Sequence, residues 1–338
     1  MEYPTASRAG EEPQSEPKSD LTADYRALSA RVGYRVAEDR LVVRITGDDR
    51  VPFLNGMCSN DIKRLEPGSL IAALLLTEHA HVVTDFYVWA RNDALILETD
   101  RAMWPSARAQ LEKFLVADDV EIEELASMAV VDIEGPQAQA AVAALAPDAG
   151  ALAPWHHVVS ERIGIANLPR FGRPAFTVLA EDAGSFVDEL NRAAASIGIR
   201  EVSAEAIEVL RIESGTPRIG VDTGTKTIAL EARLQSAISF DKGCYVGQET
   251  VERATSRGGV KKKLLGLRVR GARVPGTNAA VMLEGKEVGR VTSVADSPRI
   301  GVIGLSILHH SAWTVGTEVV IADAQGELGA SVSDLPFQ

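Results

Sequence analysis

The chain has 338 residues, of which 46% are hydrophobic and 24% charged, as is ordinary for a globular protein of two or three domains. Its 35 basic and 47 acidic residues give a formal net charge of −12, which argues against broad nucleic-acid binding driven by overall charge. Two cysteines, Cys58 and Cys244, are too few for a disulfide framework and lack the spacing of a zinc site. No apolar run reaches the roughly 18 residues of a membrane span and no secretion signal is present, so we expect a cytoplasmic protein without a membrane partner.

The first segment, residues 1–20, contains three prolines among polar residues and almost no large apolar side chain. It cannot bury enough surface to offset the entropy of the chain, so we predict a disordered tail. A helix should follow, with Thr22 near its N-terminal cap and apolar residues at helical spacing. A strand is predicted over residues 41–45, and a short helix then leads through Phe53 toward Asn60.

Three apolar runs at residues 70–76, 82–90 and 94–97 are joined by short polar connections and predict an antiparallel meander. Asp85 lies inside the second run, on the same alternating face as apolar and aromatic side chains. A carboxylate among such neighbours is costly to bury unless it is paired or functional. Asp85 is therefore either an outward-facing strand residue or a functional group.

The middle of the chain alternates helices and strands, which predicts a second α+β subdomain. Its predicted elements are helices at 104–116 and 186–197 and strands at 128–133 and 175–179. Ser203 is expected to cap a further helix that ends at Gly215. Five short strands separated by turn residues then predict a small antiparallel barrel, at 264–269, 279–283, 288–294, 302–308 and 318–321.

One segment, Phe-Asp-Lys-Gly-Cys-Tyr-Val-Gly-Gln-Glu at residues 240–249, gathers a cation, a thiol, a phenol, an amide and a carboxylate. Gly243 and Gly247 allow close backbone approach or a positive φ. Lys242 stands two residues before Cys244 and would favour its thiolate form. A buried cysteine in a glycine-rich turn is the alternative, but eight specified residues in a row indicate a site.

The run from Lys242 to Glu249 resembles the KGCYxGQE signature of the YgfZ family. Those proteins are folate-binding relatives of the glycine cleavage T-protein, an aminomethyltransferase, and they support assembly or repair of iron–sulfur enzymes. Weaker likenesses to the same families occur at residues 53–61, 211–217, 230–234 and 288–298. The resemblance runs from about residue 21 to residue 321.

The resemblance implies an α+β fold in which three domains form a ring around a central folate-sized hole, with Cys244 at or near it. The folate-binding region would be residues 21–260, and the C-terminal antiparallel β-barrel residues 261–338. Within the former we expect subdomains at 21–125 and 126–205, with residues 206–260 returning to the centre.

The implied cofactor is tetrahydrofolate or a one-carbon derivative of it, with no metal site. Cys244, Lys242 and Asp85 are the implied catalytic residues, Lys242 poising the thiolate of Cys244. The implied folate contacts are Gly243, Tyr245, Gly247, Gln248, Glu249, Glu231 and Arg253.

The sequence also departs from these families. T-proteins have an aspartate pair on the strand of Asp85, whereas Thr84 takes the other place here. Ala80 and His81 stand where YgfZ chains usually have Gly-Arg. The "TGE" glutamate of T-proteins, which contacts folate, is absent, and Arg170 and Arg173 occupy its neighbourhood.

Three functions remain open. The first is a folate-dependent accessory protein whose partners are iron–sulfur clients or assembly proteins, and the second is an aminomethyltransferase that passes a one-carbon unit to tetrahydrofolate. The third is an RNA- or protein-binding module that uses a local basic cluster, with a solvated loop as the plain alternative. That cluster consists of Arg253, Arg257, Lys261, Lys262 and Lys263.

Overall fold

The computed structural model describes residues 20–160, 163–256 and 259–338. The predicted disordered tail, apart from residue 20, lies outside the described residues, and so does Arg257 of the basic cluster. The first described helix, α1, spans Leu21–Ala30, and Asp20 rather than the expected Thr22 caps it by accepting a hydrogen bond from the Ala23 amide. No helix within the described ranges combines the length and apolarity needed to cross a membrane.

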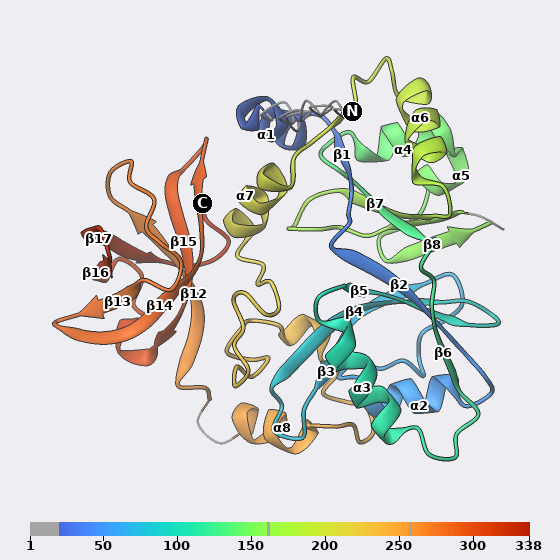
Figure 1. The fold of residues 1–338 in the computed structure, drawn as a ribbon, viewed down its shortest axis with the longest axis horizontal. Helices are drawn as coiled ribbons and strands as arrows, with labels where there is room; N and C mark the ends of the chain where they lie inside the picture. Colours follow the sequence, from blue (N-terminus) through green and yellow to red (C-terminus); the bar gives the residue numbers. More distant parts are fainter. Residues whose placement is uncertain (1–19, 161–162, 257–258) are drawn as a thin grey trace, which may run out of the picture.

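A five-stranded antiparallel sheet forms the first part of the molecule, in the order β3-β4-β5-β2-β6 (Figure 1). The predicted meander is confirmed, because β3 pairs with β4 and β4 with β5. Helices α2 and α3 supply buried side chains to the same core. The bounds are β2 Arg40–Thr46, α2 Arg50–Met57, β3 Leu70–Leu76, β4 Val82–Ala90, β5 Leu95–Asp100, α3 Trp104–Phe114 and β6 Glu121–Glu124.

A six-stranded mixed sheet, in the order β11-β1-β7-β10-β9-β8, forms the second part. Helices α4 and α6 bury apolar side chains against it. Strand β1 precedes the whole first sheet in the sequence, yet it pairs with β7 in the second. The bounds are β1 Gly33–Val36, β7 Ala129–Glu134, α4 Ala138–Leu145, α5 Pro147–Gly150, β8 His156–Val159, β9 Ile163–Asn167, β10 Ala175–Ala180, α6 Ala183–Ala193 and β11 Arg200–Glu201.

The third part is a closed antiparallel barrel in the order β12-β15-β14-β13-β16-β17. The five predicted strands are present, and a sixth that was not predicted, β17, closes the barrel between β16 and β12. The bounds are β12 Lys262–Val269, β13 Ala280–Leu283, β14 Lys286–Ser297, β15 Gly301–His309, β16 Glu318–Asp323 and β17 Gly326–Ser333.

Helix α7, Ala204–Ser214, and the irregular chain after it lie between the barrel and the two sheets (Figure 1). Its predicted ends are confirmed, because the Ser203 hydroxyl accepts a hydrogen bond from the Ala206 amide and Gly215 has a φ of +72°. Buried residues of α7 pack with those of α1 and of the barrel in one core cluster. The three parts therefore meet around this central segment, which leads on to α8, Gln248–Ser256.

Candidate functional site

The central feature is a hollow of about 560 Å³ between the two sheets, helix α7 and the chain that follows α7. Its walls come from the β1–β2 turn, strands β4 and β5, the turn at residues 170–171, helix α7 and residues 216–219. Five arginines line it: Arg35, Arg40, Arg170, Arg211 and Arg218. Six carboxylates line it as well: Glu38, Asp39, Asp85, Asp100, Glu205 and Glu208. The volume falls within the range of about 300–1,000 Å³ that is usual for small-molecule sites.

Asp85 reaches the hollow because side chains alternate between the two faces of β4. Thr84 points the other way, is fully buried and lies 3.0 Å from the Thr99 hydroxyl. The Asp85 carboxylate is 28% exposed and lies 3.5 Å from Nη1 of Arg40. Of the neighbouring residues Thr84 and Asp85, it is thus the carboxylate that faces the hollow.

Glu98 on β5 ties two of the wall arginines together. One carboxylate oxygen, Oε1, accepts hydrogen bonds from Arg40 at 3.0 Å and from Arg170 at 2.6 Å. Burial alone would raise the pKa of Glu98, but the two guanidinium groups outweigh burial and hold its pKa below the usual value. Burial likewise opposes the charge of Arg40, whereas Asp85 and Glu98 raise its pKa. Glu98, Arg40 and Arg170 therefore all stay charged in the wall.

Tyr87 supplies an aromatic surface beside this network. The guanidinium carbons of Arg40 and Arg170 lie 5.5 and 5.1 Å from the centre of its ring. These distances are in the range of cation–π contacts. Burial raises the pKa of Tyr87, so its phenol stays neutral at physiological pH.

A second pair of acids lies on the strand behind Arg35 and Arg170. Asp132 on β7 is 3.3 Å from each of these arginines. Glu134, two residues further along the same face of β7, is 2% exposed. Neither of its carboxylate oxygens has a hydrogen-bond partner among the described residues. Burial and the nearby Asp132 raise the pKa of Glu134 to about 7.

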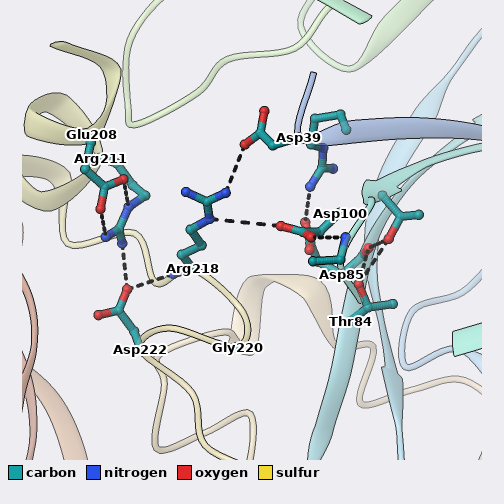
Figure 2. Close-up of polar contacts among 12 residues, drawn as sticks. Asp39, Thr84, Asp85, Asp100, Glu208, Arg211, Arg218, Gly220 and Asp222 are labelled. Atoms are coloured by element: carbon teal, nitrogen blue, oxygen red, sulfur yellow. Dashed lines mark hydrogen bonds and ion pairs between the residues drawn. The ribbon is translucent and has the colours of Figure 1, made fainter. Parts of the chain in front are cut away.

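The opposite wall is fixed by Arg211 on α7 (Figure 2). Its guanidinium donates to Glu208 on the same helix, to Asp222 at 2.7 Å and to the Ser293 hydroxyl on the barrel at 2.7 Å. Asp222 also accepts a hydrogen bond from the backbone amide of Arg218 at 2.9 Å. The loop that carries Arg218 is thereby attached both to α7 and to the barrel.

The segment around Cys244 does not line the hollow, so the expectation that Cys244 lies at or near the hole is not met by the lining of this hollow. The Lys242 ammonium donates to the backbone carbonyls of Asn55 at 2.5 Å and of Cys58 and Asn60 at 2.7 Å each. A cation at the C-terminal end of α2 is favourable because unpaired carbonyls gather there. Lys242 therefore anchors the segment to the first part of the molecule, and burial lowers its pKa to about 8.

The other residues of the segment continue this attachment. Tyr245 is 8% exposed and packs in a core cluster with side chains of the β3–β4 hairpin. Gly247 has a φ of +88°, and a Cβ there would come within 2.6 Å of the Thr77 carbonyl oxygen. The Gln248 side chain accepts from the Tyr245 amide, and Glu249 pairs with Arg253 on α8. The glycine and the tyrosine are thus needed for packing.

Cys244 itself is exposed, whereas Cys58 is buried, as the sequence suggested, and burial raises the pKa of the Cys58 thiol to about 12. Glu231 is half-buried, accepts a hydrogen bond from the Ile228 amide and has its pKa raised by burial. Of the residues predicted from the resemblance, Asp85 alone is among the described residues that line the hollow. The reactivity of Cys244 and the folate contacts predicted for the others stay predictions.

Most of the charged residues around the hollow are not predicted by the sequence. Arg40 follows Glu38 and Asp39 at the start of β2, and Glu98 precedes Thr99 and Asp100 at the end of β5, so their polar neighbours hide any signal of a buried charge. Arg218 and Asp39 lie in irregular segments far apart in the sequence. Nothing local indicates that they meet.

Two family models match the chain: the GCVT N-terminal domain over residues 11–242 and the glycine cleavage T-protein C-terminal barrel domain over residues 262–338. The chain belongs to the glycine cleavage T-protein family. The solved aminomethyltransferase T of Bartonella henselae superposes with a TM-score of 0.85 at 21% identity, covering 94% of this chain and 89% of that one. This confirms the predicted T-protein fold with its C-terminal barrel.

Relatives in the T-protein family carry different names. An aminomethyltransferase of Geobacillus thermodenitrificans is 26% identical over 332 residues, which cover 94% of this chain and 90% of the relative. A "tRNA-modifying protein YgfZ" of Serratia proteamaculans is 30% identical over 314 residues, covering 89% and 91%. A putative chloroplastic transferase of Arabidopsis thaliana is 26% identical over 305 residues, covering 87% and 68%.

Proposed function

We propose that this T-protein-family chain binds tetrahydrofolate, or a one-carbon derivative, in the central hollow and serves iron–sulfur enzymes as an accessory protein through Cys244. The observation that carries the folate part is Asp85, a carboxylate that faces a 560 Å³ hollow beside the aromatic ring of Tyr87. The motif at residues 242–249 and the YgfZ relative support the accessory role.

The residues of the hollow fit such a ligand. Tyr87 and Phe171 offer apolar and aromatic surface, and Asp85 offers an acceptor for N–H groups. Tetrahydrofolate, when bound, supplies the nitrogen atoms that carry a one-carbon unit. The part of Asp85 is to accept a hydrogen bond from a ligand amine and to hold its proton at a carboxylate oxygen. Arg40, 3.5 Å away, keeps that carboxylate oriented.

A calorimetric titration with tetrahydrofolate, kept free of oxygen, tests the folate part. We expect saturable binding near one equivalent, and Asp85→Asn should weaken it about tenfold or more, because the ligand amine loses a charged partner. Asp296→Asn, at an exposed position on the barrel, is the matched control and should bind as the wild type does. An absence of binding up to millimolar ligand would refute this part of the proposal.

The accessory role rests on Cys244, which the structure places outside the lining of the hollow. An exposed thiol on an anchored loop is accessible to a protein partner while the ligand occupies the hollow. Cys244→Ser should therefore keep tetrahydrofolate binding and lose the support of an iron–sulfur client enzyme. If Cys244 alkylates no faster than a free model thiol at neutral pH, the idea of an activated thiolate fails.

Aminomethyl transfer is the alternative function, and the carboxylate of Asp85 in the hollow favours it. Turnover with an aminomethyl-lipoyl carrier and tetrahydrofolate would establish it, and a lack of turnover would remove it. The RNA contact expected of the basic cluster stays a prediction, although Arg253 already pairs with Glu249. Such binding should weaken steeply with raised salt and with charge reversal at Lys261, Lys262 and Lys263.

A further inference from the structure

The five arginines of the hollow differ in how exposed they are and in how closely carboxylates pair with them. The side chains of Arg35, Arg40, Arg170 and Arg211 are 15, 9, 9 and 7% exposed. Each of these four contacts at least two carboxylates within 3.5 Å. Arg218 is 40% exposed and is therefore the most accessible cation of the five.

The partners of Arg218 hold it weakly. Its Nη2 lies 3.1 Å from Asp39, but Asp39 is shared with Arg35, also at 3.1 Å. Its Nε lies 4.0 Å from Asp100, which is beyond hydrogen-bond distance. Its Nη1 has no hydrogen-bond partner among the residues that the structure describes. Asp222 fixes the backbone amide of Arg218, so the side chain is positioned at the hollow (Figure 2). N–H groups of its guanidinium remain available to a ligand.

Arg218 also stands where two hollows meet. A second hollow of about 370 Å³ lies beside the first. The two share Asp39, Asp100, Arg218 and Ile219 in their linings. The contact of Arg218 with Asp39 and Asp100 thus lies at the seam between the two hollows. A ligand too long for the first hollow would extend past Arg218 into the second.

We propose that Arg218 leaves Asp39 and Asp100 on ligand binding and binds a carboxylate of the ligand's glutamyl end at this seam. This inference deepens the proposed function and rests on tetrahydrofolate, whose glutamate carries two carboxylates, occupying the main hollow. A guanidinium matches a carboxylate through two parallel N–H···O bonds. After the exchange Asp39 would keep Arg35 as its partner, and Asp100 would keep the hydrogen bond that it accepts from the Ala102 amide at 2.8 Å. Arg218 is thus a specificity residue for the acidic end of the ligand.

The test compares two ligands by calorimetry under anaerobic conditions: tetrahydrofolate and its bis-amide, in which both carboxylates are neutral. The wild type should bind the bis-amide about 10- to 100-fold more weakly, the range expected for losing charge-assisted hydrogen bonds. Arg218→Gln should bind tetrahydrofolate as weakly as the wild type binds the bis-amide, and should hardly distinguish the two ligands. Arg290→Gln, at a similarly exposed and ion-paired arginine on the barrel, should behave as the wild type does.

Asp39→Asn checks that the effect comes from ligand contact and not from the shape of the hollow. It removes the competitor for Arg218 and should bind tetrahydrofolate at least as tightly as the wild type. A loss as large as that of Arg218→Gln would overturn the inference, and so would an equal loss of both ligands in Arg218→Gln. If the wild type binds both ligands equally, Arg218 has no such role while the folate proposal stands. If the wild type binds neither, it is the folate proposal that fails.

Discussion

Glu134 makes the stability of this protein depend on pH in a way that a single substitution can reveal. Its carboxyl is 2% exposed and lacks hydrogen-bond partners among the described residues, and burial together with Asp132 raises its pKa from 4.5 to about 7. Below pH 4.5 the group is protonated in both the folded and the unfolded chain, so it costs nothing. Between pH 4.5 and 7 the unfolded chain releases the proton and the folded chain keeps it, so stability falls as the pH rises. Above pH 7 the cost is constant.

The size of this effect follows from the pKa difference. A rise from 4.5 to about 7, at about 1.4 kcal/mol per pKa unit, makes the ionised Glu134 cost about 3 kcal/mol of folding free energy. Glu134→Gln has nearly the same shape and no charge, so the substitution should be about 2–3 kcal/mol more stabilising at pH 8 than at pH 5. Any fixed cost of the unpaired amide cancels in this comparison between pH values.

Urea denaturation followed by circular dichroism at pH 5, 6, 7 and 8 measures the difference. Glu327→Gln, at an exposed glutamate of the barrel, is the matched control and should show a difference that does not change with pH. A constant difference for Glu134→Gln as well would refute the reasoning, because it would show that Glu134 ionises as readily in the folded chain as in the unfolded one.

Two further predictions concern the segment around Cys244. Lys242→Met should cost about 2–4 kcal/mol of stability, because three backbone carbonyls at the end of α2 lose a charged donor. Lys262→Met, at an exposed lysine, is the control and should change stability little. Equal midpoints of urea denaturation for the two variants would contradict the anchoring role. Iodoacetamide should modify Cys244 alone in the native protein and both thiols in urea, because Cys58 is buried and its pKa is raised to about 12. Mass spectrometry counts the labels. Labelling of Cys58 in the native protein as fast as that of Cys244 would refute the burial argument.

The sequence predicts elements whose signals are local. The β3–β4–β5 meander follows from three apolar runs, and the ends of α7 follow from Ser203 and Gly215. Strand β1, Gly33–Val36, is different, because its four residues pair with β7 about a hundred residues later and nothing nearby in the sequence fixes that partner. The sixth barrel strand, β17, was missed because it contains three polar residues and two glycines among its eight positions.

The residues of the site also differ in whether the local sequence predicts their place. Asp85 can be selected from the sequence because a carboxylate among apolar strand residues is costly to bury. In the structure its side chain lines the hollow. The sequence places Lys242 two residues from Cys244 and so predicts an effect on that thiol. Its ammonium instead donates hydrogen bonds to backbone carbonyls more than 180 positions earlier in the chain. Arg218 and Asp39 are likewise brought together only by the folded chain. Charged side chains select partners by distance in space, which sequence proximity does not supply.

The hollow and the exposed thiol are separate surfaces, yet they rest on one piece of core. Leu74 on β3 lies opposite Asp85 on β4 in the strand register. Leu74 also belongs to the core cluster that contains both Tyr245, the neighbour of Cys244, and Ile219, the neighbour of Arg218. Because interiors are close-packed, a change in the position of Ile219 or of the hairpin is expected to alter the packing around Tyr245 through this shared cluster. The packing that positions Asp85 and Arg218 is thus also the packing that positions Tyr245 beside Cys244, so we expect substitutions at Ile219 to affect both the hollow and the thiol.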